Sequence, residues 1–352
     1  MRATGPRAYL TTDITAIPGG KMHKPLLAMS FVLLILAAAT SPLRGIETET
    51  EDPDKSPVIS STAVSPGGDI AAVVGDDHLI RIHRIEDEKV LHTLRGHTDW
   101  VRAAAFQPDG KALATAGDDR RVLLWSIPFG EDPRKLPKHP QVIYTMAYSP
   151  DGKLLACGGF ERMIRVYNTV DGSFHYGLKA PGRDVRALAF SPDGTRLAAA
   201  GSDGRIRLWN IQSGKAIHDL QGHTRKVSAL AFTPDGKVLA SAGEERLVRL
   251  WEAETGQSLG NLPRTNQKLM ALAWCGPDLL AAAGSGNVVE LWSVADGKKT
   301  KTLEGHTGSI ATLTYKESDN TLISAGYDTT ARTWSLETGR ETASRQTEET
   351  IK

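Results

Sequence analysis

The stretch Leu220–Glu252, LQGHTRKVSALAFTPDGKVLASAGEERLVRLWE, contains three short β-strand patterns. VSALAF, KVLASAG and LVRLWE are each rich in apolar residues and bounded by turn residues. In the TPDG turn between the first two, Pro234 presets one corner and Gly236 can adopt the left-handed conformation. A fourth strand pattern, SLGNL, follows the turn at Thr255 and Gly256. Four antiparallel strands with two apolar faces make a sheet too small to be stable alone, so this unit must pack between neighbours.

The unit recurs about seven times along the chain. The position of Trp251 recurs at spacings of 42, 42, 42, 42, 41 and 42 residues, as His83, Trp125, Tyr167, Trp209, Trp251, Trp292 and Trp334. A shorter turn, CGPD at Cys275–Asp278, accounts for the single spacing of 41. Gly-His pairs precede three of the tryptophans by 28 residues, at Gly96-His97, Gly222-His223 and Gly305-His306. The chain is therefore built of repeats.

With repeat length, Gly-His pair, PDG turn and final Trp in one register, residues 56–344 resemble the WD-repeat (WD40) family of β-propellers. The resemblance implies an all-β fold, a seven-bladed β-propeller of four-stranded antiparallel blades. The first strands are expected to begin near Ile59, Val101, Ile143, Val185, Val227, Leu269 and Ile310.

The last blade can be completed from either end of the chain. RETASR, after Gly339, aligns with KKTKTL at Lys298–Leu303, which favours completion from the carboxyl end. The acidic segment at Glu47 is the competing candidate. Residues 345–352 are expected to form a disordered tail.

Residues 1–39 have the layout of a secretory leader. An apolar run of 14 residues, Leu26–Ala39, follows Lys21 and Lys24, and cleavage after Ala39 is the simplest interpretation. Met22 is a candidate for the true start. The run is short for a membrane span, which needs about 20 apolar residues, but an uncleaved anchor through Leu26–Ala39 is the alternative.

Residues 40–55 contain ETETEDPDK and are expected to be an acidic linker. With the leader removed, we expect an exported protein of bacterial type, periplasmic or extracellular, with no membrane insertion. The alternative is a membrane-anchored protein.

Charge and cysteines exclude several function classes. Removal of residues 1–39 takes away four basic residues and one acidic residue, which changes the formal charge from +1 to −2. This balance argues against nucleic-acid binding. Cys157 and Cys275 belong to blades 3 and 6, too far apart for a disulfide. No phosphate-binding loop, metalloprotease motif or nucleophile elbow is present, and we expect no metal and no cofactor.

The resemblance assigns a His, a Ser or Thr, an Asp and the Trp of a repeat to one buried hydrogen-bond network. Blades 2, 5 and 7 carry these residues: His97, Thr115, Asp119 and Trp125; His223, Ser241, Glu245 in place of Asp, and Trp251; and His306, Ser324, Asp328 and Trp334. Blade 3 has a degraded set, namely His139, Cys157, Glu161 and Tyr167. A Ser/His/Asp set also suggests a nucleophile. Its recurrence at the period of the blades and the absence of an oxyanion-hole motif favour a structural brace.

The resemblance also places two residues of each blade on one rim of the ring. They precede the first-strand anchor or the tight-turn acid, and they include Trp100, Asp118, Val142, Phe160, Asp184, Lys226, Lys268 and Tyr327. Trp100, Val142 and Phe160 form a predicted hot spot flanked by Asp118 and Asp184, with Lys226 and Lys268 on the far side. Alternatively, these side chains only cover the ends of the blades.

Two function classes remain. The first is a non-catalytic protein-protein interaction scaffold, a monomeric ring that presents its rim to a protein or peptide partner of unknown identity outside the cytoplasm. The second is a propeller enzyme, hydrolase-like, with a site at the mouth of the central channel. Alanine at the expected channel-side positions argues against a polar site there, at Ala105, Ala147, Ala189, Ala231 and Ala273.

Overall fold

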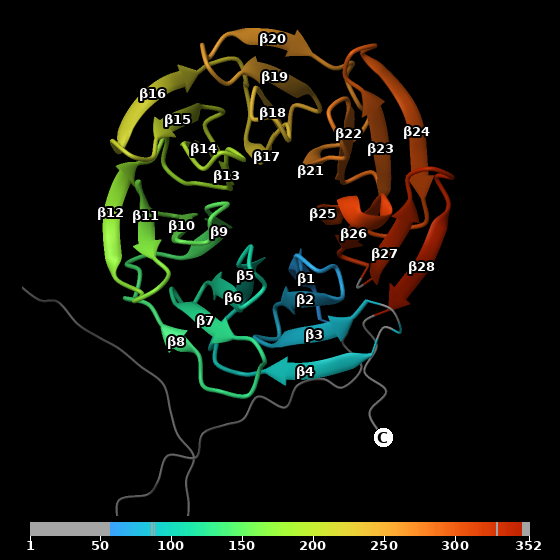
Figure 1. The fold of residues 1–352 in the computed structure, drawn as a ribbon. Coiled ribbons are helices and arrows are strands. Elements are labelled where there is room, and N and C mark those ends of the chain that lie inside the picture. Colours follow the sequence, from blue (N-terminus) through green and yellow to red (C-terminus); the bar gives the residue numbers. More distant parts are fainter. Residues whose placement is uncertain (1–56, 86, 88, 329, 347–352) are drawn as a thin grey trace, which may run out of the picture. The chain divides into compact units, whose positions relative to one another are not determined.

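The computed structural model describes residues 57–346, apart from residues 86, 88 and 329. This part of the chain forms seven four-stranded antiparallel sheets arranged as the blades of a ring (Figure 1), which confirms the predicted all-β propeller. Its one helix is the 3-10 turn η1 (Glu317–Asp319). No helix in the described ranges is long and apolar enough to cross a membrane. The predicted leader, the apolar run Leu26–Ala39 and the acidic linker lie outside the described residues, as do residues 347–352.

Each blade takes its four strands consecutively from the chain, and they lie in chain order from the centre of the ring to its edge (Figure 1). The first strands are β1 (Ile59–Val64), β5 (Val101–Phe106), β9 (Ile143–Tyr148), β13 (Ala187–Phe190), β17 (Val227–Phe232), β21 (Leu269–Trp274) and β25 (Ile310–Lys316). The second strands are β2 (Ile70–Gly75), β6 (Ala112–Gly117), β10 (Leu154–Gly159), β14 (Arg196–Ala200), β18 (Val238–Gly243), β22 (Leu279–Gly284) and β26 (Thr321–Gly326).

The outer half of each blade holds the third and fourth strands. The third strands are β3 (Ile80–Arg84), β7 (Val122–Ser126), β11 (Met163–Asn168), β15 (Ile206–Asn210), β19 (Val248–Glu252), β23 (Val288–Ser293) and β27 (Thr330–Ser335). The fourth strands are β4 (Val90–Leu94), β8 (Arg134–Lys135), β12 (Phe174–Lys179), β16 (Lys215–Leu220), β20 (Ser258–Asn261), β24 (Lys298–Glu304) and β28 (Glu341–Gln346).

Apolar side chains between adjacent sheets hold the ring together. Buried clusters join blade 1 to 2, 2 to 3, 3 to 4, 4 to 5, 5 to 6 and 6 to 7. Six of the seven second strands end in glycine, and in blade 4 Gly201 directly follows β14, because the segment that leads into the first strand of the same blade passes very close. A Cβ on Gly117 would lie 1.9 Å from the Trp100 carbonyl oxygen, and one on Gly243 1.9 Å from that of Lys226. Glycine at this position therefore sets the path of the first strand past the second.

Blade 7 is completed by the carboxyl-terminal segment. Trp334 pairs with Glu341 just as Trp292 of blade 6 pairs with Lys299, so the predicted alignment of RETASR with KKTKTL is confirmed. β28 extends to Gln346, two residues past the predicted end of the propeller at residue 344. The ring closes where β1 packs beside β25.

Six of the seven first strands begin at the predicted residue, and that of blade 4 begins two residues later. β13 begins at Ala187 and not at Val185. In blade 2 the Asp118 N–H donates to the main-chain oxygen of Trp100 at 2.9 Å. In blade 4 the corresponding N–H, that of Ser202, donates to the side chain of Asp184 at 2.9 Å. The carboxylate replaces a main-chain acceptor, and the first strand starts later.

Candidate functional site

The first strands carry a β-bulge at their second residue. In β5 the pairing with β6 passes from Val101 directly to Ala103, so Arg102 faces no residue of the partner strand. The same interruption occurs in five more blades, at Ser60, Tyr144, Ser228, Met270 and Ala311. A bulge inserts an unpaired residue and redirects its side chain. In blade 4 the equivalent residue, Arg186, lies just before β13.

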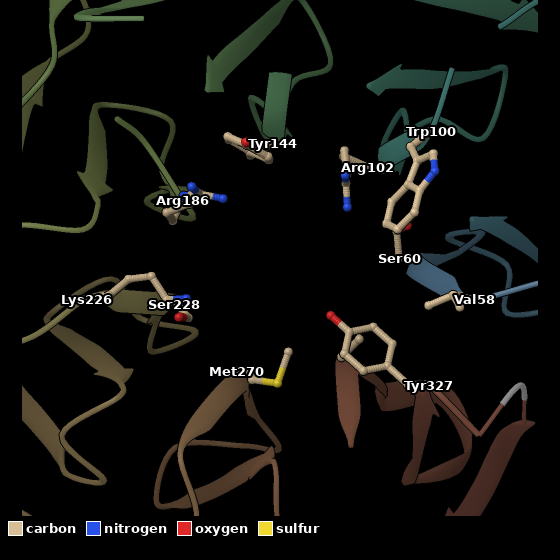
Figure 2. Close-up of a pocket in the computed structure, with 11 residues that line it drawn as sticks. Val58, Ser60, Trp100, Arg102, Tyr144, Arg186, Lys226, Ser228, Met270 and Tyr327 are labelled. Carbon is tan, nitrogen blue, oxygen red and sulfur yellow. The ribbon is translucent and has the colours of Figure 1, made fainter. Parts of the chain in front are cut away.

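These seven residues line one opening at the end of the central channel, which we call the mouth (Figure 2). Val58, Trp100, Lys226 and Tyr327 complete its lining, and it encloses about 430 Å³. Ligand sites in proteins have volumes of about 300–1,000 Å³. The mouth is therefore large enough to receive a ligand segment.

The expectation of a non-polar channel mouth is wrong, because the mouth contains arginine, lysine, tyrosine and serine. The alanines on which that expectation depended lie elsewhere. Ala189, Ala231 and Ala273 pack against the apolar clusters between blades 4 to 7. The bulge breaks the simple alternation of faces along the strand, so the channel-facing residue is the one directly after the anchor.

Arg102, Asp118 and Trp100 form one unit at the mouth on blade 2. Arg102 donates from Nε to Asp118 Oδ1 at 2.9 Å and from Nη2 to Oδ2 at 2.6 Å. Its Cζ lies 4.1 Å from the centroid of the half-buried Trp100 ring. Burial lowers the pKa of Arg102, but its bonds to Asp118, the charge of that carboxylate and smaller contributions from Tyr144 and Tyr327 together raise it more, so the pKa lies above its ordinary value. The guanidinium is thus a fixed cation beside the predicted rim tryptophan.

A second unit of the same kind lies on blades 3 and 4. Arg186 Nε donates to Asp184 Oδ2 at 2.7 Å, and Arg186 Cζ lies 3.7 Å from the centroid of the Tyr144 ring (Figure 2). Asp184 is only 3% exposed and also accepts bonds from the N–H and hydroxyl of Ser202. Burial raises the pKa of Asp184, but Ser202 and Arg186 lower it more, so the net shift is downward.

Asp184 is therefore a buried support for Arg186, and the prediction that it is an exposed rim residue is wrong. A short carboxylate next to the main-chain N–H and the hydroxyl of Ser202 folds inward to accept their bonds.

The remaining predicted rim residues lie at the surface or at the edge of the mouth. Phe160 is 54% exposed and its ring contacts Tyr144 edge-on at 6.3 Å, while Val142, next to β9, is half-buried. Tyr327 is 43% exposed, and its hydroxyl points into the mouth (Figure 2).

Two lysines mark the far side of the mouth. Lys226 lines the mouth, and its Nζ lies 3.1 Å from Glu244 Oε1. Lys268 is exposed, and its main-chain N–H donates to the Ser285 hydroxyl at 3.0 Å. The rim thus combines aromatic rings on blades 2, 3 and 7 with cations on blades 5 and 6.

The four residues assigned to the network of blade 2 are hydrogen-bonded to one another. His97 lies 2.9 Å from Asp119 through Nδ1 and 2.8 Å from the Thr115 hydroxyl through Nε2. The indole N–H of Trp125 donates to the same hydroxyl at 2.9 Å. Burial raises the pKa of Asp119, but the bond and charge of His97 and the N–H groups of Arg121 and Thr98 together lower it more, so the net shift is downward.

Blade 7 repeats this arrangement. His306 lies 2.8 Å from Asp328 and 2.7 Å from the Ser324 hydroxyl, which also accepts from Trp334 at 2.8 Å. Thr330 adds a contact of 3.1 Å to the ring of His306.

Blade 5 departs from the pattern at its glutamate. His223 lies 2.7 Å from the Ser241 hydroxyl, which accepts from Trp251 at 2.8 Å. Glu245 Oε1 lies 2.7 Å from His223 Nδ1, but the angle is not that of a hydrogen bond. The longer side chain is instead held by Arg249 at 2.8 Å. Burial lowers the pKa of His223 to about 4.

Blades 3 and 6 form hydrogen bonds at this place with other residue types. In blade 3 the Tyr167 hydroxyl bonds His139 at 2.9 Å, and burial lowers the pKa of His139 to about 4. In blade 6 Gln267 accepts from the Gly286 N–H at 3.1 Å and donates to the Val288 oxygen at 3.3 Å. Gln267 does not follow from the register of the repeat, because it lies two residues beyond Thr265, which occupies the histidine position in blade 6.

The network hydroxyls are inaccessible to a substrate. Thr115, Ser241 and Ser324 have no exposed surface, and each already accepts a bond from a tryptophan. Cys157 and Cys275 are free thiols, as the sequence predicts, and both are buried. In the described part of the chain, no three His, Cys, Asp or Glu side chains are arranged to hold a metal ion.

Comparisons with known proteins identify the repeats. The family model described as "WD domain, G-beta repeat" matches residues 88–126, 130–168, 214–252 and 297–335. The model described as "Anaphase-promoting complex subunit 4 WD40 domain" matches residues 174–229. The matched segments lie between β4, the fourth strand of blade 1, and β27, the third strand of blade 7.

Relatives match over short segments. The chain is 34% identical over 64 residues to eukaryotic translation initiation factor 3 subunit I of Schizosaccharomyces pombe, covering 18% of this chain and 20% of that protein. It is 38% identical over 61 residues to cilia- and flagella-associated protein 57 of Mus musculus, covering 17% and 5%. It is 33% identical over 63 residues to protein tipD of Dictyostelium discoideum, covering 18% and 10%. The chain thus matches a fifth or less of each relative, and these eukaryotic proteins give the predicted bacterial type no support.

Proposed function

Because the chain belongs to the WD40-repeat family of β-propellers, we propose that it is a non-catalytic protein-interaction scaffold. The partner is a protein or peptide that binds across the mouth and the adjacent rim of blades 2 to 4 and 7. Protein-interaction scaffolds are commonly WD40 propellers, but the fold alone does not identify the partner.

The observation that carries this proposal is a set of surface aromatic rings around one opening. Phe160 and Tyr327 are 54% and 43% exposed, and the half-buried Trp100 lies beside the mouth. Exposed rings in turns add little to folding, while tryptophan, tyrosine and arginine are enriched in binding hot spots. Arg102 and Tyr144 hold two of these rings in place, so little conformational freedom is lost when a partner binds.

The enzyme alternative finds less support at the same opening. The mouth lining contains two serines, Ser60 and Ser228, but no histidine, cysteine, aspartate or glutamate. A serine nucleophile needs an adjacent general base. The mouth therefore supplies positive charge, hydroxyls and aromatic rings, which suit binding.

We further propose that the protein is a monomeric ring exported through the leader at residues 1–39. The support is the apolar run Leu26–Ala39 after two lysines. Amino-terminal sequencing of the native protein should give a chain that starts at Thr40. An intact Met1 or Met22 on protein isolated from the cytoplasm would refute export.

Binding at the rim is tested with Trp100→Ala. We expect this variant to weaken the binding of a captured partner by about thirtyfold, which corresponds to about 2 kcal/mol, with an almost unchanged Tm. The matched control is Leu259→Ala on β20, which removes a side chain that is 53% exposed on the outer edge of the ring. It should leave binding unchanged. A Trp100→Ala protein that unfolds early but binds normally once folded would assign Trp100 to structure.

A further inference from the structure

Building on the proposed function, we infer that the partner segment bound at the mouth is an acidic peptide, whose carboxylates are held by Arg102 and Arg186. The site consists of two guanidinium groups, one on blade 2 and one on blade 4, that face the same cavity, with hydroxyls of the mouth around them (Figure 2). Neither arginine follows from the repeat pattern, because both occupy the redirected position after the first-strand anchor.

Both arginines keep free donors. A guanidinium carries five N–H groups. Within the described residues, Arg186 uses only Nε, on Asp184, and its Nη1 and Nη2 atoms have no hydrogen-bond partner. Arg102 uses Nε and Nη2 on Asp118, which leaves Nη1 free. Forked guanidinium donors match the two oxygens of a carboxylate.

Both guanidiniums are also fixed before any ligand arrives. Each is held between a carboxylate and an aromatic face, Arg102 by Asp118 and Trp100, and Arg186 by Asp184 and Tyr144. A flexible surface arginine loses side-chain entropy on binding, and a fixed one loses less. This distinguishes the two mouth arginines from exposed ones such as Arg264.

The charge pattern favours an anionic ligand. The mouth lining contains three cations, namely Arg102, Arg186 and Lys226, and no acidic residue. The acids that pair with these cations do not line the cavity. A carboxylate that enters the cavity therefore contacts the N–H donors of these cations, while the acids that pair with the cations lie outside the lining.

A peptide fits this site better than a nucleic acid. Single-stranded nucleic acids bind by stacking bases on aromatic faces in a strongly basic groove. Here arginines already cover the rings of Trp100 and Tyr144, and each cation of the mouth is paired with an acid. The carboxylates of a peptide can bind the free N–H groups at the edges of the guanidiniums, so they do not require an uncovered aromatic face.

The test uses the full chain and a fluorescein-labelled oligoglutamate peptide with blocked ends, followed by fluorescence anisotropy. An oligoglutamine peptide of equal length is the ligand control. The variant Arg102→Gln with Arg186→Gln should weaken oligoglutamate binding by at least about tenfold, because it removes charge-assisted hydrogen bonds. The matched control Arg205→Gln with Arg264→Gln removes two exposed cations and should change binding by less than about threefold.

A second measurement avoids dependence on the folding of the variant, since loss of Arg186 leaves the buried Asp184 without its cation. In the wild-type chain, bound oligoglutamate should protect Arg102 and Arg186 from modification by phenylglyoxal, as read by mass spectrometry, while Arg264 stays reactive.

Three results would overturn the inference. Oligoglutamate could bind no better than oligoglutamine, both double variants could weaken binding equally, or an oligothymidine strand could compete at the mouth more strongly than the peptide. If oligoglutamate fails while partner capture still depends on Trp100, the acidic ligand class is wrong and the scaffold function stands. If the chain binds neither oligoglutamate nor a captured partner, the proposed function itself is wrong.

Discussion

The exchange of Ala282 for serine should stabilise the ring, because blade 6 lacks one hydrogen bond that three other blades make. In blades 2, 5 and 7 the indole N–H of the third-strand tryptophan donates to a second-strand hydroxyl at 2.9, 2.8 and 2.8 Å. In blade 6 that position is Ala282, and Trp292 Nε1 is buried without a partner. Ala282 pairs with Glu290 as Ser241 pairs with Arg249, so the new hydroxyl would lie in the same register.

The expected gain is about 1 kcal/mol. A buried N–H without a partner costs about 1–3 kcal/mol, and satisfying it recovers most of this. The new hydroxyl must itself be buried, which offsets part of the gain unless its proton finds an acceptor. The Glu290 main-chain oxygen is in the place of the Arg249 oxygen, which lies 3.5 Å from the Ser241 hydroxyl. In a domain of this size, about 1 kcal/mol raises Tm by about 2 °C.

The assay is thermal and urea unfolding of Ala282→Ser beside Ala283→Ser. Ala283 is equally buried and next in the strand, but it packs on the opposite face of the sheet, against blade 7. A hydroxyl there satisfies no orphaned donor and should cost about 1–3 kcal/mol. Opposite signs for the two variants are expected. If Ala282→Ser lowers the unfolding midpoint as much as Ala283→Ser does, the missing-bond argument is refuted.

Three further predictions concern histidines and closure. Burial lowers the pKa values of His139 and His223 from 6.5 to about 4. Between pH 6.5 and about 4 the unfolded chain therefore binds more protons than the folded chain, so the free energy of unfolding should fall as the pH drops through this range. Urea midpoints at about pH 7 and 4.5 measure this, and His139→Gln should flatten the dependence; an unchanged slope would contradict the assignment. His97→Ala and His306→Ala should each cost about 1–3 kcal/mol, and His139→Ala less; denaturation with the reverse order would argue against a brace. Ending the chain at Gly339 removes β28 and should lower Tm, whereas loss of the last six residues should not; an equal Tm for both truncations would favour closure from the amino terminus.

The propeller could be predicted from the sequence because its determinants repeat in register. A tryptophan or its substitute every 41 or 42 residues, a turn such as TPDG after Phe232 and a glycine at or just after the end of each second strand are local signals, and each of them recurs. Repetition multiplies weak local evidence, and each blade can bury its faces only against another blade. The network residues follow from the same register, which is why Thr115 and Asp119 lie within bonding distance of His97.

The mouth could not be predicted in this way, because its residues follow neither strand alternation nor any shared chemistry. The position after the first-strand anchor holds Ser60, Arg102, Tyr144, Arg186, Ser228, Met270 and Ala311 in the seven blades. A bulge, which leaves no fixed residue type in the sequence, turns six of these side chains toward the channel.

That variety is itself a usable signal within a single chain. Positions that hold one blade to the next must solve the same packing problem seven times, so they converge on small sets such as glycine or tryptophan. A position that faces a ligand meets a different part of that ligand in each blade, so its residues have no reason to converge. The residue after the anchor varies from alanine to arginine beside an anchor that is always valine, isoleucine or leucine. A varied position next to a uniform one, at the inner edge of a closed ring, therefore indicates the binding surface.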